Sequence, residues 1–170
     1  VSLNQIDSTC LNDAPIILNT GVPLGGVYSG SGVANGIFNP SLSNVGPNEI
    51  FYSYTDLNGC VNETSVITYV KPLPSVNLSI LNSLCEDASS IILSNGSPLG
   101  GTYDGNGVFN GSFYPDSTGP GVFNISYTTE LNGCFATDSS YIEVFALPTL
   151  NVSQLPELCV YDTLLLDVVS

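Results

Sequence analysis

An internal repeat of about 74 residues constrains this chain more than any other feature of its sequence. Pro-Leu-Gly-Gly at 23–26 recurs at 98–101, and the Leu-Asn-Gly-Cys that ends at Cys60 recurs with its end at Cys134. A fixed period of this length indicates tandem copies of one structural unit. We therefore predict three units: unit 1 over residues 1–74, unit 2 over 75–148, and the N-terminal part of a truncated third unit over 149–170.

Each unit has the pattern of short β-strands separated by tight turns. No stretch sustains helical periodicity, and Gly or Pro interrupts the chain about every ten residues. Phe123, Ile125 and Tyr127 alternate with polar residues, as in a strand with one buried face. In unit 2 we predict strands near 76–81, 90–94, 101–104, 111–115, 122–129 and 138–145. This pattern predicts an all-β protein of tandem immunoglobulin-like β-sandwich domains.

The composition excludes several kinds of function. The chain contains one Lys or Arg in total, no His, and 15 Asp and Glu, which gives a net charge of −14. Catalysis by a histidine-activated nucleophile needs a His, and binding of nucleic acid needs several cations. No run of 18 apolar residues is present to span a membrane. We expect no enzyme activity, no nucleic-acid partner and no membrane insertion.

Five cysteines follow the repeat, at positions 10, 60, 85, 134 and 159. We predict one disulfide within each full unit, which leaves Cys159 unpaired; buried free thiols are the alternative. These predicted pairs are Cys10–Cys60 and Cys85–Cys134. Four predicted strand crossings lie between the two cysteines of a unit, so both reach the same end of the sandwich. Disulfides are typical of extracellular proteins.

A different pairing follows if each unit has one more strand. A short fifth strand near Val33 or Val108 would place the two cysteines of a unit at opposite poles. A seven-strand immunoglobulin topology would have this effect. The disulfide would then join neighbouring units, linking Cys10 to Cys134.

Acidic residues supply one candidate calcium site. Asp13, Glu86, Asp87 and Asp162 lie shortly after the first Cys of their units, where loops of adjacent domains meet. Calcium requires six to eight oxygen ligands. Solvated carboxylates are the interpretation that we favour, so we expect no cofactor. The calcium-like segment at 104–107 is interpreted as a glycine-rich turn, because its repeat counterpart at 29–32 carries no charge.

The combined pattern resembles a known family. Cys followed by Ile-Ile-Leu, Pro-Leu-Gly-Gly-x-Tyr, Gly-x-Gly-Val, Asn-Gly-x-Phe-x-Pro and a late Asn-Gly-Cys are similar to the immunoglobulin-like repeats of giant Bacteroidota cell-surface proteins. Gliding-motility-associated adhesins and other type IX secretion cargo belong to this group. The resemblance covers the whole chain. It implies a structural or adhesive stretch of a long extracellular filament, whose partners are neighbouring repeats and surface glycans or other cells.

Two further expectations depend on this setting. Asp-(Ser/Thr) patterns similar to those of Bacteroidota O-glycosylation make Ser8, Ser117 and Thr163 candidate glycan acceptors in predicted loops. The alternative function is a carbohydrate-binding or spacer region of a secreted multidomain enzyme. Recurring aromatic residues would bind sugar if exposed, although we expect them to pack in the core; they are Tyr28, Tyr103, Phe38 and Phe113.

Overall fold

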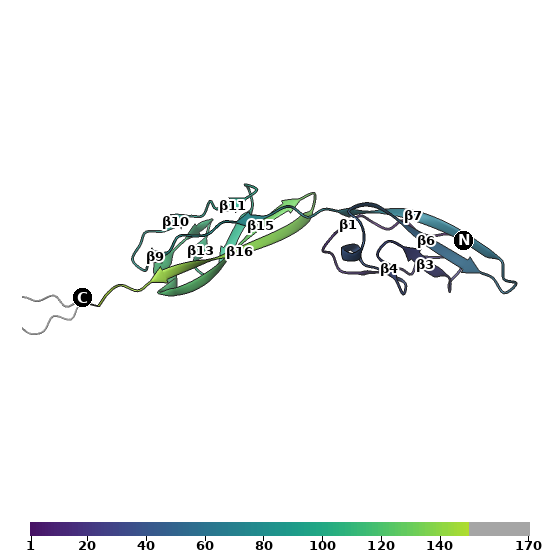
Figure 1. The fold of residues 1–170 in the computed structure, drawn as a ribbon, viewed down its shortest axis with the longest axis horizontal. Helices are drawn as coiled ribbons and strands as arrows, with labels where there is room; N and C mark the ends of the chain where they lie inside the picture. The colour runs from purple at the N-terminus through teal and green to yellow at the C-terminus, as the bar shows by residue number, and fades with distance from the viewer. Residues whose placement is uncertain (150–170) are drawn as a thin grey trace, which may run out of the picture.

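The computed structural model describes residues 1–149. The predictions for Cys159, Asp162 and Thr163 lie outside these residues. Two groups of β-strands follow one another along an elongated molecule, the first made by residues of unit 1 and the second by residues of unit 2 (Figure 1). The prediction of an all-β protein is confirmed.

The strands of unit 1 form two sheets. They are β1 (Thr9–Cys10), β2 (Ile16–Ile17), β3 (Val27–Gly30), β4 (Val33–Ala34), β5 (Ile37–Phe38), β6 (Gly46–Thr55) and β7 (Val61–Lys71). One sheet has the order β1-β7-β6-β3, and the other has the order β2-β5-β4. A short 3₁₀ helix, η1 (Pro40–Leu42), connects β5 to β6, and Asn39 caps it by accepting from the Ser41 N–H.

Unit 2 repeats this arrangement strand for strand. Its elements are β8 (Asn77–Leu78), β9 (Leu84–Cys85), β10 (Ile91–Ile92), β11 (Gly96–Ser97), β12 (Thr102–Gly105), β13 (Val108–Phe109), β14 (Ser112–Phe113), α1 (Pro115–Thr118), β15 (Gly121–Leu131) and β16 (Cys134–Phe145). The order β9-β16-β15-β12 matches the first sheet of unit 1, and β10-β14-β13 matches the second. The β8–β11 pair corresponds to the single bridge between Ser2 and Val22.

A long antiparallel hairpin forms the backbone of each unit. β6 pairs with β7 in unit 1, and β15 pairs with β16 along its whole length in unit 2. The alternating apolar residues predicted for the second hairpin place Ile125 and Tyr127 inside, where both are buried. The alternation of the sequence therefore sets which face of the sheet meets the core.

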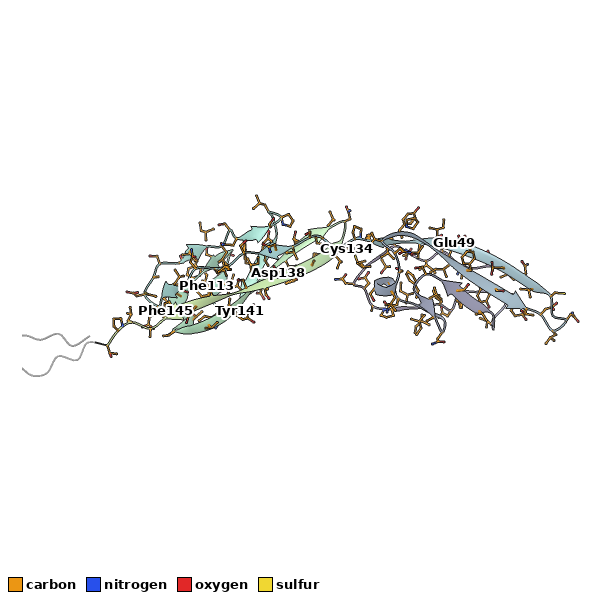
Figure 2. The ribbon with its side chains drawn as sticks, in the orientation of Figure 1. Glu49, Phe113, Cys134, Asp138, Tyr141 and Phe145 are labelled. Carbon is orange, nitrogen blue, oxygen red and sulfur yellow. A yellow bond between two sulfur atoms is a disulfide. The ribbon has the colours of Figure 1, made fainter. Side chains whose placement is uncertain are left out.

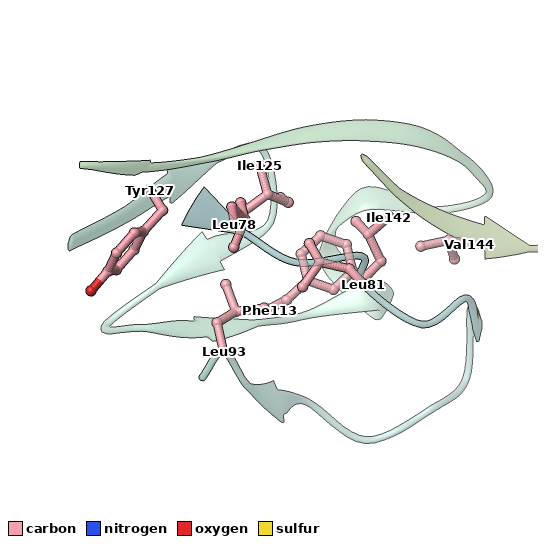
Figure 3. Packing of buried hydrophobic residues seen from close by; sticks show 8 residues of the cluster. All are labelled: Leu78, Leu81, Leu93, Phe113, Ile125, Tyr127, Ile142 and Val144. Carbon is pink, nitrogen blue, oxygen red and sulfur yellow. The ribbon is translucent and has the colours of Figure 1, made fainter. Parts of the chain in front are cut away.

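Each unit has a hydrophobic core of its own. Unit 1 buries Leu18, Phe38, Ile50 and Val70 together. Unit 2 buries an equivalent but larger cluster around Phe113, which lies between the two sheets (Figure 3): Leu78, Leu81, Leu93, Phe113, Ile125, Tyr127, Ile142 and Val144. Separate cores allow each unit to be stabilised by burial of its own apolar surface.

The repeated Pro-Leu-Gly-Gly segment closes over a buried tyrosine. In unit 1 the Tyr52 hydroxyl donates to the Pro23 carbonyl and accepts from the Gly26 N–H. A Cβ atom on Gly26 would lie 2.4 Å from the Ser53 carbonyl oxygen, so only glycine fits there. Tyr127 repeats these contacts in unit 2, which gives the segment a structural role.

The sequence pattern did not predict three short strands of unit 2, namely β9, β11 and β13. β13 and its counterpart β4 are the hidden strands near Val108 and Val33 on which the cysteine pairing depends. Each is only two residues long and pairs with the strand that follows it. Two-residue strands show no alternation that a sequence pattern can reveal.

Candidate functional site

The junction between the two units is the candidate functional site, because it carries the covalent bond between them. Cys10 of unit 1 and Cys134 of unit 2 form a disulfide, with their Cα atoms 5.6 Å apart. Figure 2 shows Cys134 at the end of its sheet that faces unit 1. Cys10 is 8% exposed and Cys134 is fully buried, whereas Cys60 and Cys85 are exposed free thiols.

The predicted pairs Cys10–Cys60 and Cys85–Cys134 are therefore wrong, and the alternative between neighbouring units is the one present. The physical reason is the length of the last strand. Cys10 lies beside Lys71 at the end of β7, whereas Cys60 directly precedes the start of that strand. The 11 residues of β7 separate these points by roughly 35 Å. A disulfide requires Cα atoms within about 7 Å.

A two-residue parallel strand holds Cys10 in place. β1 pairs with the end of β7, and the Leu11 N–H donates to the Lys71 carbonyl at 3.1 Å. The Asp13 carboxylate then accepts from the Thr9 hydroxyl and the Cys10 N–H, both at 2.7 Å. Cys10 is thus fixed both to the sheet and to the following turn.

These contacts also set the charge state of Asp13. Its pKa lies below the ordinary aspartate value, chiefly because the Cys10 N–H donates to the ionised carboxylate. The Thr9 hydroxyl and the positive charge of Lys71 lower the pKa further. Asp13 therefore acts as a structural anion beside the disulfide.

A tight turn presents Cys134 to its partner. Leu131 and Cys134 pair across β15 and β16, enclosing only Asn132 and Gly133. Both enclosed residues have positive φ, 53° and 84°. Such two-residue turns favour Asn-Gly because most side chains resist this conformation. The turn is held at the tip of the hairpin, where Cys10 reaches it.

Two hydrogen bonds cross the junction beside the disulfide. The Lys71 ammonium donates to the Asn132 carbonyl at 3.2 Å, and the Asn12 amide donates to the Phe135 carbonyl at 3.2 Å. Together with the linker after β7, these contacts join the units at several points. The sequence offered no signal for either hydrogen bond, because both acceptors are backbone carbonyls.

The other candidate residues are not gathered into one site. Phe38 and Phe113 are fully buried. Tyr28 packs against Tyr52 with 4.7 Å between the ring centroids and the ring planes tilted by 45°, and Tyr103 packs in the same way against Tyr127. The paired aromatics thus pack in the core rather than forming an exposed sugar-binding surface.

The candidate modification and calcium residues are dispersed. Ser8 and Ser117 are both exposed, the first just before β1 and the second within α1. Residues 104–107 end β12 and form the turn into β13, as expected for a glycine-rich turn. Glu86 accepts from the Leu147 N–H. Over residues 1–149, no group of three His, Cys, Asp or Glu side chains is placed to hold a metal ion, and no helix is long and apolar enough to cross a membrane.

Comparison with known proteins gives no family. No family model and no curated protein matches the sequence. Among solved structures 19 chains match. One is the crystal structure of the titin domains z1z2 in complex with telethonin, which is 12% identical over 85% of this chain and 93% of that chain, with a TM-score of 0.22. A TM-score this low does not establish a shared fold, so the fold of this chain is described by its own strand pairing.

Proposed function

We propose that this chain is a structural repeat region of a long, adhesive extracellular surface fibre. It consists of tandem immunoglobulin-like β-sandwich domains of about 74 residues and has no catalytic role. Neighbouring repeats are its first partners, and surface glycans or other cells are the targets of the fibre. The observation that carries this proposal is the disulfide between Cys10 and Cys134. Structural disulfides persist in oxidising, extracellular surroundings.

The position of the disulfide suits a protein that bears tension. A force applied to the two ends of the chain enters through the residues before Cys10 and crosses the sulfur–sulfur bond. It leaves through the residues that follow Cys134. The residues between these cysteines, which are 124 positions apart, lie outside this covalent path. The segment between Cys10 and Cys134 therefore cannot be extended while the bond is intact, whereas β16 of unit 2 lies on the loaded path.

Single-molecule force spectroscopy on the full chain, attached at both ends, tests this function. Under oxidising conditions we expect no unfolding event that releases the segment between Cys10 and Cys134. After reduction, or in the Cys10→Ser variant, unfolding of that segment should release roughly 400 Å of additional length. A chain that releases this length equally well in its oxidised form would contradict the mechanical role proposed for the Cys10–Cys134 disulfide.

A further inference from the structure

The exposed Cys85 occupies the same structural position as the bonded Cys10. β9 pairs in parallel with the end of β16 and sets Cys85 opposite Phe145, as β1 sets Cys10 opposite Lys71. The residue after each cysteine donates its N–H to the carbonyl of that opposite residue, at 2.9 Å in unit 2 and 3.1 Å in unit 1. The far end of unit 2 therefore presents Cys85 on the same backbone frame that presents Cys10.

The exposed Cys60 is the counterpart of Cys134. Both end a Leu-Asn-Gly-Cys segment in the turn of the long hairpin. Their turns differ, because in unit 1 the Asp56 carboxylate accepts from the Cys60 N–H and the Asn58 N–H, both at 2.8 Å. Gly59 has φ 82°, and Asn58 stays out of the left-handed region that Asn132 adopts. The same four residues thus take one turn where the thiol is free and another where it is bonded.

The two ends of the described molecule are complementary halves of one junction. One end carries the Cys134-type hairpin with a free thiol, and the other carries the Cys10-type strand with a free thiol. The contact is head-to-tail, so it can be repeated without limit, unlike a two-fold interface. At the Cys85 end, Asp87 and Phe145 stand where Asn12 and Lys71 make their hydrogen bonds. The hydrogen bonds made by Asn12 and Lys71 are therefore specific to the first junction, and the disulfide is the contact that successive junctions can share.

We propose that Cys85 and Cys60 are further junction half-sites, each of which takes another repeat unit of the same kind as its partner. Cys85 bonds the hairpin cysteine of a following unit, and Cys60 bonds the first cysteine of a preceding unit. The two thiols lose two protons and two electrons in forming the bond. A small-molecule disulfide such as oxidised glutathione accepts them and becomes two thiols. The inference rests on the proposed function, because it requires an array of such units.

Cross-pairing of two single-thiol variants tests the inference. On a Cys159→Ser background, Cys85→Ser keeps only the Cys60 thiol, and Cys60→Ser keeps only the Cys85 thiol. One variant is isotope-labelled, the two are mixed in equal amounts in a glutathione redox buffer, and the disulfide-linked dimers are counted by mass spectrometry. Random collision of the exposed thiols gives the mixed dimer twice as often as either homodimer.

Complementary half-sites should raise the mixed dimer well above this ratio, by about tenfold or more relative to the homodimers. Statistical proportions, or the absence of disulfide-linked dimers, would overturn the inference. Replacement of Asn12 by Ala in both variants is a matched control. Asn12 belongs to the junction already formed, so this change should leave the ratio of mixed dimer to homodimers unaltered. The cross-pairing experiment depends on Cys60 and Cys85, whereas the force experiment depends on Cys10 and Cys134. Failure of this inference is therefore distinguishable from failure of the proposed function.

Discussion

Much of the repeated sequence consists of residues whose hydrogen bonds or close packing tolerate no other side chain. Tyr52 and Tyr127 each tie a glycine N–H and a proline carbonyl to the sheet. Gly26 and Gly101 leave no space for a side chain against those rings. The residues that recur at fixed spacing are therefore those that hold the loop over the core. These contacts account for the recurring Pro and the second Gly of the Pro-Leu-Gly-Gly segment.

Removal of the buried hydroxyl should be costly in unit 1. The Tyr52→Phe variant leaves the Gly26 N–H and the Pro23 carbonyl without this partner, and we expect unfolding to require about 1–2 kcal/mol less. Chemical denaturation measures the change. Tyr69, which is 56% exposed, supplies the matched control Tyr69→Phe, for which we expect a change below about 0.5 kcal/mol. Equal effects of the two substitutions would contradict the role given to the Tyr52 hydroxyl.

Asp13 should make the stability of unit 1 sensitive to acid. Its pKa is lowered in the folded protein, so its ionised form stabilises the fold above the unfolded-state pKa. That contribution is lost as the pH falls through the lowered pKa. We expect the difference in denaturation midpoint between the native chain and Asp13→Asn to be full at pH 6 and to shrink between about pH 4 and pH 2. A difference that stays constant over this range would show that charge is not involved.

At the scale of elements, the sequence predicts long strands and leaves two-residue strands hidden. Alternating apolar residues predict β15 within two residues of its observed limits and the last two thirds of β16. The strand β4 between Gly32 and Asn35 is too short to show alternation, although turn residues bracket it on both sides. Without β4 and β13, the predicted number of strand crossings places Cys60 and Cys134 at the wrong end of their units. The sequence therefore predicts disulfide pairs within units.

The hairpin turns offer an element-scale prediction about the disulfide. Asn132 has φ 53° in the bonded turn, and alanine resists this conformation more than asparagine does. The Asn132→Ala variant should disfavour the bonded form by about 1 kcal/mol, or about fivefold in the equilibrium constant with glutathione. Asn58→Ala is the matched control, since Asn58 does not adopt that conformation. Equal shifts in both variants would argue against turn geometry as the cause.

At the scale of the whole molecule, two units with separate cores are held by a linker, two hydrogen bonds and one disulfide. Because the covalent bond lies beside the linker segment Pro72–Pro74, the units are tethered at two points and cannot swing as freely as on a linker alone. Pro-Leu-Pro itself favours an extended path. The elongated arrangement in Figure 1 follows from these restraints.

The connection between Cys10 and Cys134 is the central claim, and non-reducing peptide mapping tests it most directly. Free thiols are first blocked by alkylation under denaturing conditions, and the intact chain is then digested without reductant. We predict one cross-linked species that contains the Cys10 and Cys134 peptides and separates into the two on reduction, with Cys60 and Cys85 alkylated in the monomer. Cross-linked peptides that join Cys10 to Cys60 and Cys85 to Cys134 would contradict the account.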